Sequence, residues 1–251
     1  MIRFESVFKA FGPKEVLRGL DLVIPDNVTT VILGYSGTGK SVALKLICGL
    51  LQADAGRVMV DERCVGELER DALVNLRGEI GFVFQFAALF DSMTVAENLR
   101  LGLRKRGLDA AAMEQRVAES LAMVDLSGAE DRFPAELSGG MRKRVGIARA
   151  IALRPRYILY DEPTTGLDPV TSAVIDQLIV RTQNELGVTG VVVTHDLRSA
   201  YTVGDRMAML YEGAIRQVGS VEEMRDSADP VVRQFLEGRP EPVGQQLVTS
   251  D

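Results

Sequence analysis

Eight consecutive residues of the chain have the types and spacing of a phosphate-binding loop, G-x-x-x-x-G-K-[ST]. They are Gly34, Tyr35, Ser36, Gly37, Thr38, Gly39, Lys40 and Ser41. Glycines allow successive backbone N–H groups to curve around an anion, and a helix that begins near Lys40 would point its positive end at the phosphates. Lys40 would add a charge for the β- and γ-phosphates, and the Ser41 hydroxyl a ligand for Mg²⁺. The adjacent Val42 is expected to contact the nucleotide as well.

A pair of carboxylates, Asp161 and Glu162, follows the apolar run YILY. A carboxylate at that place is suited to hold the magnesium shell through water. Glu162 is then a candidate general base for an attacking water molecule. The alternative interpretation is an acidic cap at the start of a helix, and it loses weight because the phosphate-binding loop is in the same chain.

Two further polar residues stand where apolar runs end. Gln85 lies between Phe84 and Phe86, and an unpaired amide in such surroundings would be costly to bury. A contact with Mg²⁺ or water at a strand end would satisfy it. His195, the only histidine, follows the run VVVT and is expected to hydrogen-bond the γ-phosphate, although a purely structural role is the alternative.

A second candidate anion site is the sequence Ser138-Gly139-Gly140 at the start of a basic helix. Two anion sites beside one phosphate-binding loop become sensible if two chains pair head to tail, each offering its Ser-Gly-Gly to the other's nucleotide. Residues 142–144 (Arg-Lys-Arg) raise the alternative of nucleic-acid binding. The acidic net charge favours a solvated or phosphate-adjacent helix face instead.

The elements that must position these residues are short apolar strands alternating with helices. Four near-continuous apolar runs predict strands covered on both faces, as in a parallel α/β sheet. These runs are residues 29–33, 80–84, 157–160 and 191–194. Each ends in polar residues or glycine, and ligands of open α/β sheets bind beyond the carboxyl ends of the strands. All four strand ends should therefore face one site.

The segment from about 87 to 152 has a different pattern. Apolar residues at helical spacing predict a helix over 113–124, and a second helix covers 142–153, limited by Pro155. This segment is expected to be a mostly helical insertion between two strands. The tail, 238–251, contains two prolines and two glycines. It is expected to be disordered, with docking on a neighbouring subunit as the alternative.

The composition of the chain excludes several classes of protein. The chain has 251 residues, 46% of them hydrophobic, with a net charge of −6, which excludes a mostly disordered or collagen-like chain. Its longest strongly apolar run, 80–90, is too short to span a membrane by itself. The acidic balance predicts no nucleic-acid partner. No secretory signal is visible at residues 1–12, and the two cysteines fit a reducing compartment.

Taken in order, these motifs resemble the nucleotide-binding domain of ABC ATPases. The resemblance runs from Phe4 to about Gly219 and rests on GYSGTGKS, Gln85, LSGGM, YILYDEP, the Gly-Leu-Asp ending at Asp168, and His195. It implies a P-loop NTPase (RecA-like) core with a mainly parallel sheet, an N-terminal antiparallel β region and an inserted helical subdomain. One domain would cover 1–237.

The resemblance also implies roles for the residues. ATP and Mg²⁺ would be bound and ATP hydrolysed by a homodimer attached to a membrane permease. Phe11 would stack on adenine, Gln85 would form the Q-loop, Asp168 the D-loop at the dimer interface, and His195 would be the switch histidine. Departures from the family pattern are Phe11 for Tyr, Met141 for Gln and Asn27 for Gly. The Met141 replacement puts a partner-chain contact to the ribose in doubt.

A finer resemblance points to the Mla/Mkl-type branch, which energises phospholipid or other lipid transport with MCE-domain partners. It rests on residues 84–95, on LSGGMRKRVGIARA and on residues 233–238. It implies a peripheral protein at the cytoplasmic face of the inner membrane. The alternatives are an ATPase of another importer, such as one for amino acids, and a soluble ATPase of Fe–S cluster assembly. Chromosome ATPases of the SMC type require a long coiled coil, and two-domain translation factors a second phosphate-binding loop; the sequence has neither.

Overall fold

The computed structural model describes residues 1–104 and 107–239. The predicted tail lies outside these ranges from residue 240 onward. Within the described ranges, each helix is too short or too polar to cross a membrane.

A six-stranded sheet forms the centre of the molecule. Its order is β10-β9-β3-β8-β7-β6, and all neighbours are parallel except β9 and β10. The strands are β3 (Thr29–Leu33), β6 (Ile80–Val83), β7 (Tyr157–Asp161), β8 (Thr189–Thr194), β9 (Arg206–Tyr211) and β10 (Ala214–Ser220). The four apolar runs are therefore four adjacent parallel strands, as the sequence predicts.

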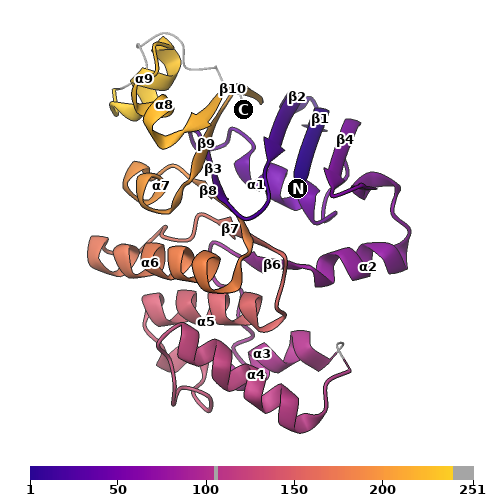
Figure 1. Cartoon of the computed structure of the whole chain (residues 1–251), viewed down its shortest axis with the longest axis vertical. Coiled ribbons are helices and arrows are strands. Elements are labelled where there is room, and N and C mark those ends of the chain that lie inside the picture. Colours follow the sequence, from indigo (N-terminus) through magenta and orange to yellow (C-terminus); the bar gives the residue numbers. More distant parts are fainter. Residues whose placement is uncertain (105–106, 240–251) are drawn as a thin grey trace.

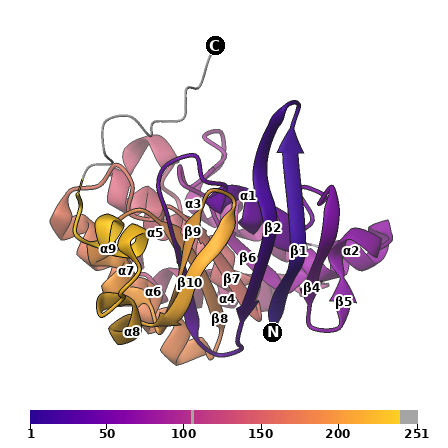
Figure 2. The ribbon, with the colours of Figure 1, turned by 90° about the horizontal axis from the view of Figure 1, so that it is seen from above.

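A second sheet is antiparallel and lies in the N-terminal part, with the order β2-β1-β4-β5. Its strands are β1 (Ile2–Phe11), β2 (Lys14–Ile24), β4 (Ala55–Val60) and β5 (Arg63–Cys64). Figure 2 shows β1 and β2 standing beside α1 (Lys40–Ile47), which contacts β4 of one sheet and β7 and β8 of the other. The phosphate-binding helix is thus packed between the two sheets.

Between β6 and β7 the described residues form helices rather than strands (Figure 1). These are α3 (Val95–Leu103), α4 (Ala110–Met123), the 3₁₀ turn η3 (Pro134–Glu136) and α5 (Gly139–Ala152). Both predicted helices begin three residues earlier than expected, because Asp109 and Ser138 accept hydrogen bonds as N-caps. The remaining helices are η1 (Val65–Glu67), α2 (Arg70–Gly78), α6 (Pro169–Leu186), α7 (Leu197–Val203), α8 (Val221–Arg225) and α9 (Pro230–Leu236).

The core is divided by the central sheet into two apolar clusters. In β3, Ile32 packs with α1 and the antiparallel sheet, whereas Val31 and Leu33 pack with the helices on the opposite face. Every residue of β3 is buried. Burial on both faces explains why the strand reads as a continuous apolar run instead of an alternating one.

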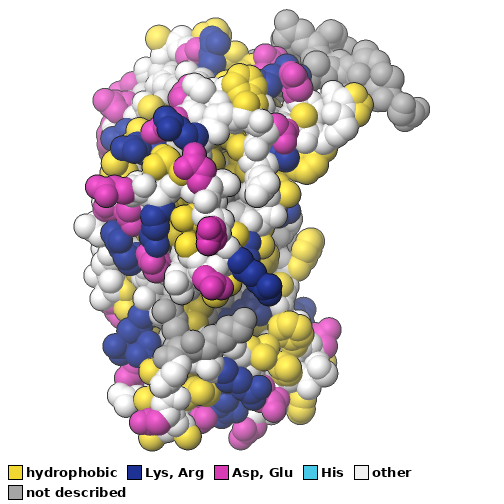
Figure 3. Space-filling model, turned by 90° about the vertical axis from the view of Figure 1, so that its right-hand side faces the viewer, with side chains coloured by type: hydrophobic (Ala, Val, Ile, Leu, Met, Phe, Trp, Pro, Cys, Tyr) yellow, Lys and Arg dark blue, Asp and Glu magenta, His cyan; other side chains and the backbone are white. Residues whose placement is uncertain are grey.

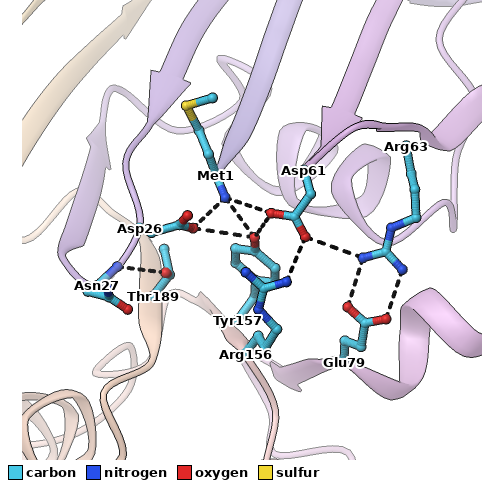
Figure 4. Close-up of polar contacts among 9 residues, drawn as sticks. All are labelled: Met1, Asp26, Asn27, Asp61, Arg63, Glu79, Arg156, Tyr157 and Thr189. Atoms are coloured by element: carbon cyan, nitrogen blue, oxygen red, sulfur yellow. Dashed lines mark hydrogen bonds and ion pairs between the residues drawn. The ribbon is translucent and has the colours of Figure 1, made fainter.

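A polar network joins the two sheets at the end where β7 begins (Figure 4). The Tyr157 hydroxyl donates to Asp61 Oδ1 at 2.6 Å, and Arg156 donates to Asp61 Oδ2 at 2.9 Å. The amino group of Met1 donates to Tyr157 Oη at 2.7 Å. Burial, together with the hydrogen bond to Asp61, raises the pKa of Tyr157 above its usual range. The network lies opposite the strand ends that carry the motifs, so it fixes the sheets relative to each other without entering the site.

Candidate active site

The phosphate-binding loop connects β3 to α1, and Gly39 is the N-cap of that helix. Gly39 has a φ of 104°, and a Cβ added there would lie 2.9 Å from the side chains of Val16 and Leu17. A larger residue would push the loop away from β2 and strain its backbone. The glycine thus lets the loop curve tightly while it packs on β2.

A cavity of about 360 Å³ opens above this loop. It is lined by Phe11, Lys14, Val16, Ser36, Gly37, Gly39, Lys40, Ser41, Val42 and Glu162. Phe11 is 46% exposed at the end of β1. Lys14 and Val16 were not expected from the sequence. The pairing of Phe11 with Lys14 across the β1–β2 turn brings them there, and a hairpin register would have been the only signal.

Lys40 is held inside the loop. Its side chain is 6% exposed, and Nζ donates to the carbonyl oxygens of Gly34 at 2.8 Å and Tyr35 at 3.0 Å. Burial lowers the pKa of Lys40, while the nearby carboxylates of Glu162 and Asp161 act in the opposite direction. The ammonium is therefore poorly solvated and suited to a charged ligand such as a phosphate.

Ser41 and Asp161 form a pair of hard oxygen atoms beside Lys40. The Ser41 hydroxyl donates to Asp161 Oδ1 at 2.6 Å, and Asp161 is the last residue of β7. Mg²⁺ prefers oxygen ligands, keeps several waters, and takes only one or two protein ligands beside substrate phosphates. These two residues fit that requirement, Ser41 directly and Asp161 through water.

Glu162 collects hydrogen-bond donors on one carboxylate. Oε2 accepts from Thr165 Oγ1 at 3.2 Å and Thr194 Oγ1 at 3.4 Å, and lies 2.9 Å from Nδ1 of His195. Its backbone has a φ of 47°, a strained conformation of the kind found at functional sites. The acidic-cap alternative does not apply, because Asp168 caps the next helix, α6.

Gln85 follows β6, which is the neighbour of β7 in the sheet. It is not among the residues that line the cavity. Its backbone carbonyl accepts a short hydrogen bond from Lys143 Nζ. The predicted contact of the Gln85 amide with Mg²⁺ or water stays a prediction.

Ser138, Gly139 and Gly140 lie at the start of α5 and do not line the cavity. The Ser138 hydroxyl caps α5 by accepting from the Met141 N–H at 3.2 Å. A Cβ on Gly140 would lie 2.4 Å from Thr171 Cγ2, so glycine allows α5 to approach α6 closely. The second candidate anion site is therefore not part of the cavity above the chain's own phosphate-binding loop.

The sequence placed residues 142–144 on a solvated or phosphate-adjacent helix face, and the solvated alternative is wrong for Lys143. Lys143 does not lie on a solvated face, because it is only 6% exposed. Its Nζ donates to the carbonyl oxygen of Gln85 and lies 3.5 Å from the carbonyl oxygen of Glu162. In α5, Lys143 precedes the buried Ile147 by four residues and Ala150 by seven. That helical spacing was the signal that placed it inside.

The loop also contacts the C-terminal helices, which the sequence did not indicate. The rings of Tyr35 and Phe235 meet edge to face, with centroids 5.0 Å apart. Phe235 belongs to α9 and is 9% exposed. Such an aromatic pair adds about 0.5–1.5 kcal/mol beyond its buried area.

The sequence of the chain is similar to a known protein family and to several known proteins. The family model described as ABC transporter matches residues 17–165. The probable ribonucleotide transport ATP-binding protein mkl of Mycobacterium tuberculosis is 41% identical over 239 residues, which cover 95% of this chain and 67% of that protein. The chloroplastic protein TRIGALACTOSYLDIACYLGLYCEROL 3 of Arabidopsis thaliana is 39% identical over 256 residues, covering 95% and 74%.

Solved structures agree with these relatives. The dimeric structure of MJ0796, a bacterial ABC transporter cassette, aligns with a TM-score of 0.81 and 35% identity, covering 88% of this chain and 99% of that one. A post-hydrolysis dimer of the same cassette, bound to ADP and Pi, aligns with a TM-score of 0.80 and 34% identity, with the same coverage. The predicted α/β fold is confirmed.

Proposed function

The chain belongs to the ABC transporter family, and on that premise we propose that it powers lipid transport, with phospholipid as the cargo, through a separate membrane permease. Membership of the family makes it an ATP-binding cassette and an ATPase, as its motifs predict. The observation that supports coupling to a permease is the exposed aromatic segment after β6, whereas the lipid cargo is argued from a resemblance of sequence. The exposed aromatic residues Phe86 and Phe90 follow Gln85 directly in the chain. Gln85 in turn follows β6, at the end of the sheet where the proposed nucleotide site lies.

For the reaction, we assign roles by the contacts of each residue. Lys40 binds the β- and γ-phosphates, and Ser41 and Asp161 hold Mg²⁺, which neutralises phosphate charge when bound. Glu162 orients and deprotonates the attacking water, and His195 contacts the γ-phosphate beside it. Phe11, exposed at the mouth of the cavity, stacks on the adenine ring.

We also propose that the working unit is a homodimer. The cavity carries donors from the phosphate-binding loop on one side, whereas Ser138, Gly139 and Gly140 stand at a helix N-terminus outside it. A second copy placed head to tail would bring its own three residues to the nucleotide. Asp168, at the N-cap of α6 and linked to Thr171, would lie at that interface.

The permease-facing surface is assigned to the helical part of the chain. Phe86 is 84% exposed, Phe90 54% and Phe133 43%, and large apolar side chains left exposed to this extent are candidates for a protein contact. Figure 3 shows hydrophobic side chains gathered on the lower part of the face it presents. Charged side chains of both signs are interspersed over the rest of that face, which offers no support for a nucleic-acid partner.

The lipid assignment rests on residues 84–95 and 233–238, which resemble the Mla/Mkl-type branch with its MCE-domain components. A relative at 39% identity is named after a galactolipid, trigalactosyldiacylglycerol. The mkl relatives are named for ribonucleotide transport, and a further relative at 39% identity is a methionine import protein. The cargo must therefore be decided by transport itself.

The test is to purify the tagged chain with its membrane partners and reconstitute the complex in liposomes. We expect an integral permease and an MCE-domain protein to co-purify from the inner membrane. We expect ATP-dependent movement of a labelled phospholipid, abolished by Lys40→Ala. Movement of a ribonucleotide instead, or a permease accompanied by a soluble amino-acid-binding protein and no MCE component, would overturn the lipid assignment and leave the ATPase assignment intact.

A further inference from the structure

Residues 85–88 run along α5 and are bound to it through their backbone. Lys143 donates to the carbonyl oxygen of Gln85. Arg149 donates to the carbonyl oxygens of Ala87 at 2.9 Å and Ala88 at 2.6 Å. Two cations of one helix therefore hold three of the four carbonyl groups of residues 85–88, the segment that begins at Gln85 and contains the exposed Phe86.

The segment held in this way is strained. Ala87 and Ala88 have φ values of 59° and 48°, the left-handed region that residues with a Cβ avoid. Each such residue costs about 1–2 kcal/mol, so two in succession persist only where the surroundings enforce them. A Cβ on Gly146 would lie 3.4 Å from that of Ala87, which is van der Waals contact distance, so the segment lies directly on α5.

Of the two cations, Lys143 is buried and Arg149 is half-buried. Lys143 is 6% exposed, and its ammonium also lies 3.5 Å from the carbonyl oxygen of Glu162. Burial lowers the pKa of Lys143, which Glu162 and Asp161 partly oppose, and burial lowers the pKa of Arg149. A buried cation is expensive unless it is well hydrogen-bonded, so these bonds are not incidental surface contacts.

From these contacts we propose that Lys143 and Arg149 are positioning residues, which hold residues 85–88 in a strained bend that sets Gln85 and Phe86 relative to Glu162. They act through backbone carbonyls and touch no nucleotide. Because Ser138 caps the same helix, α5 links the surface offered to the partner's nucleotide with the segment that carries Phe86. This inference rests on the proposed function, since it gives Phe86 a place on the permease-facing surface.

The test compares Lys143→Met and Arg149→Lys with Arg144→Lys. Methionine keeps the length and apolar stem of Lys143 without a donor. Lysine keeps the charge of Arg149 but replaces the planar fork, whose two nitrogens each reach one carbonyl group, by a single point donor. Arg144 is a matched control, because it also donates to backbone carbonyls, those of Val124 and Asp125, but away from the segment. Amide exchange of residues 86–89 and the KM and kcat for ATP are measured on the full chain.

We expect both variants to speed amide exchange at residues 86–89 about 10-fold, the effect of losing one or two net hydrogen bonds. We expect kcat to fall about 10-fold while KM for ATP changes less than about 2-fold, because neither residue lines the cavity. Adding Ala87→Gly and Ala88→Gly to Arg149→Lys should restore part of kcat, since glycine accepts the bend without strain.

Exchange and kcat equal to those of Arg144→Lys would overturn the proposal. So would faster exchange with unchanged kcat, because the bend would then not position Gln85 for the reaction. These readouts need no permease. A failure to find a lipid-transporting partner would count against the proposed function and not against this inference.

Discussion

Nδ1 of His195 lies 2.9 Å from Oε2 of Glu162, and Nζ of Lys40 lies 3.5 Å from the other oxygen of the same carboxylate. His195 and Lys40, which are both assigned to the γ-phosphate, thus both contact the carboxylate of Glu162, the proposed general base. A bound triphosphate would compete with Glu162 for both of them. Its arrival would free the carboxylate to contact the attacking water.

The first prediction concerns Glu162→Gln. Removing the base should lower the rate of ATP hydrolysis by roughly 10²–10⁴-fold, the usual contribution of general-base catalysis. ATP binding should persist, because Lys40 keeps its hydrogen bonds to the loop carbonyls. Phosphate release and equilibrium binding of ATP are measured together. The exposed Glu185→Gln on α6 is the control, and near-normal turnover in Glu162→Gln would remove the proposed role.

The second prediction tests the head-to-tail dimer. Glu162→Gln should accumulate an ATP-dependent dimer, because ATP is bound and not hydrolysed. Adding Ser138→Arg should abolish it, since a bulky cation would fill the space offered to the partner's phosphate. Light scattering with and without ATP gives the mass. A double variant that still dimerises, or a single variant that stays monomeric at high concentration with its permease present, would contradict the arrangement.

The third prediction concerns Asp176, a buried acid on α6. The side chain is 3% exposed, Oδ2 accepts from the Ser199 hydroxyl at 3.0 Å, and Oδ1 has no hydrogen-bond partner. Burial raises the pKa of Asp176 to about 6; the charge of Asp196 adds to this, while Ser199 and Arg198 oppose it. The folded state therefore binds a proton more tightly than the unfolded state, whose carboxyl titrates near 3.9.

Stability contributed by this group falls as pH rises from about 4 to about 6, and above that window the charged form costs on the order of 2–3 kcal/mol. Asp176→Asn should thus raise Tm at pH 7.5, less at pH 5, and hardly at all near pH 4. Thermal melts across this range test it. The exposed Asp226→Asn should show no such window. A gain that is independent of pH would mean that the charge of Asp176 is not the cause.

The sequence predicts best those parts of the fold that depend on local pattern. Residues 29–33 read as a strand because both faces of β3 are buried, and the structure has the same bounds. The phosphate-binding loop follows because glycine, lysine and serine at fixed spacing have a definite local geometry. Helix starts were missed by three residues because Asp109 and Ser138 cap through side-chain hydrogen bonds that apolar periodicity does not reveal.

Contacts between distant segments were not predictable in the same way. Tyr35 and Phe235 lie 200 positions apart, and only tertiary packing brings their rings together. Lys143 was assigned, with Arg142 and Arg144, to a solvated or phosphate-adjacent face because the net charge of the chain is acidic and the basic run is short. Its burial depends on backbone carbonyls of Gln85 and Glu162, which are acceptors that side-chain patterns cannot show.

The last prediction separates two adjacent residues on the permease-facing surface, Leu89 and Phe90. Leu89 packs against the core, whereas Phe90 is 54% exposed. The backbone of Phe90 is fixed by the fully buried Asn98, which accepts from its N–H at 2.8 Å and donates to its carbonyl oxygen at 3.2 Å. Phe90 is thus an apolar side chain presented to a partner by a rigid segment.

Phe90→Asp should therefore weaken assembly with the permease and leave ATP binding and Tm near the wild-type values. Leu89→Asp should lower Tm by burying a charge in the core, so it cannot separate folding from assembly. Leu50→Asp, at a side chain exposed to 50% just after α1, is the control for adding a charge to an exposed apolar position. Pull-down yield and ATP affinity are measured for each variant. Wild-type yield of permease with Phe90→Asp would show that the partner binds elsewhere, because a carboxylate cannot lie unpaired in an apolar interface without a large loss of affinity.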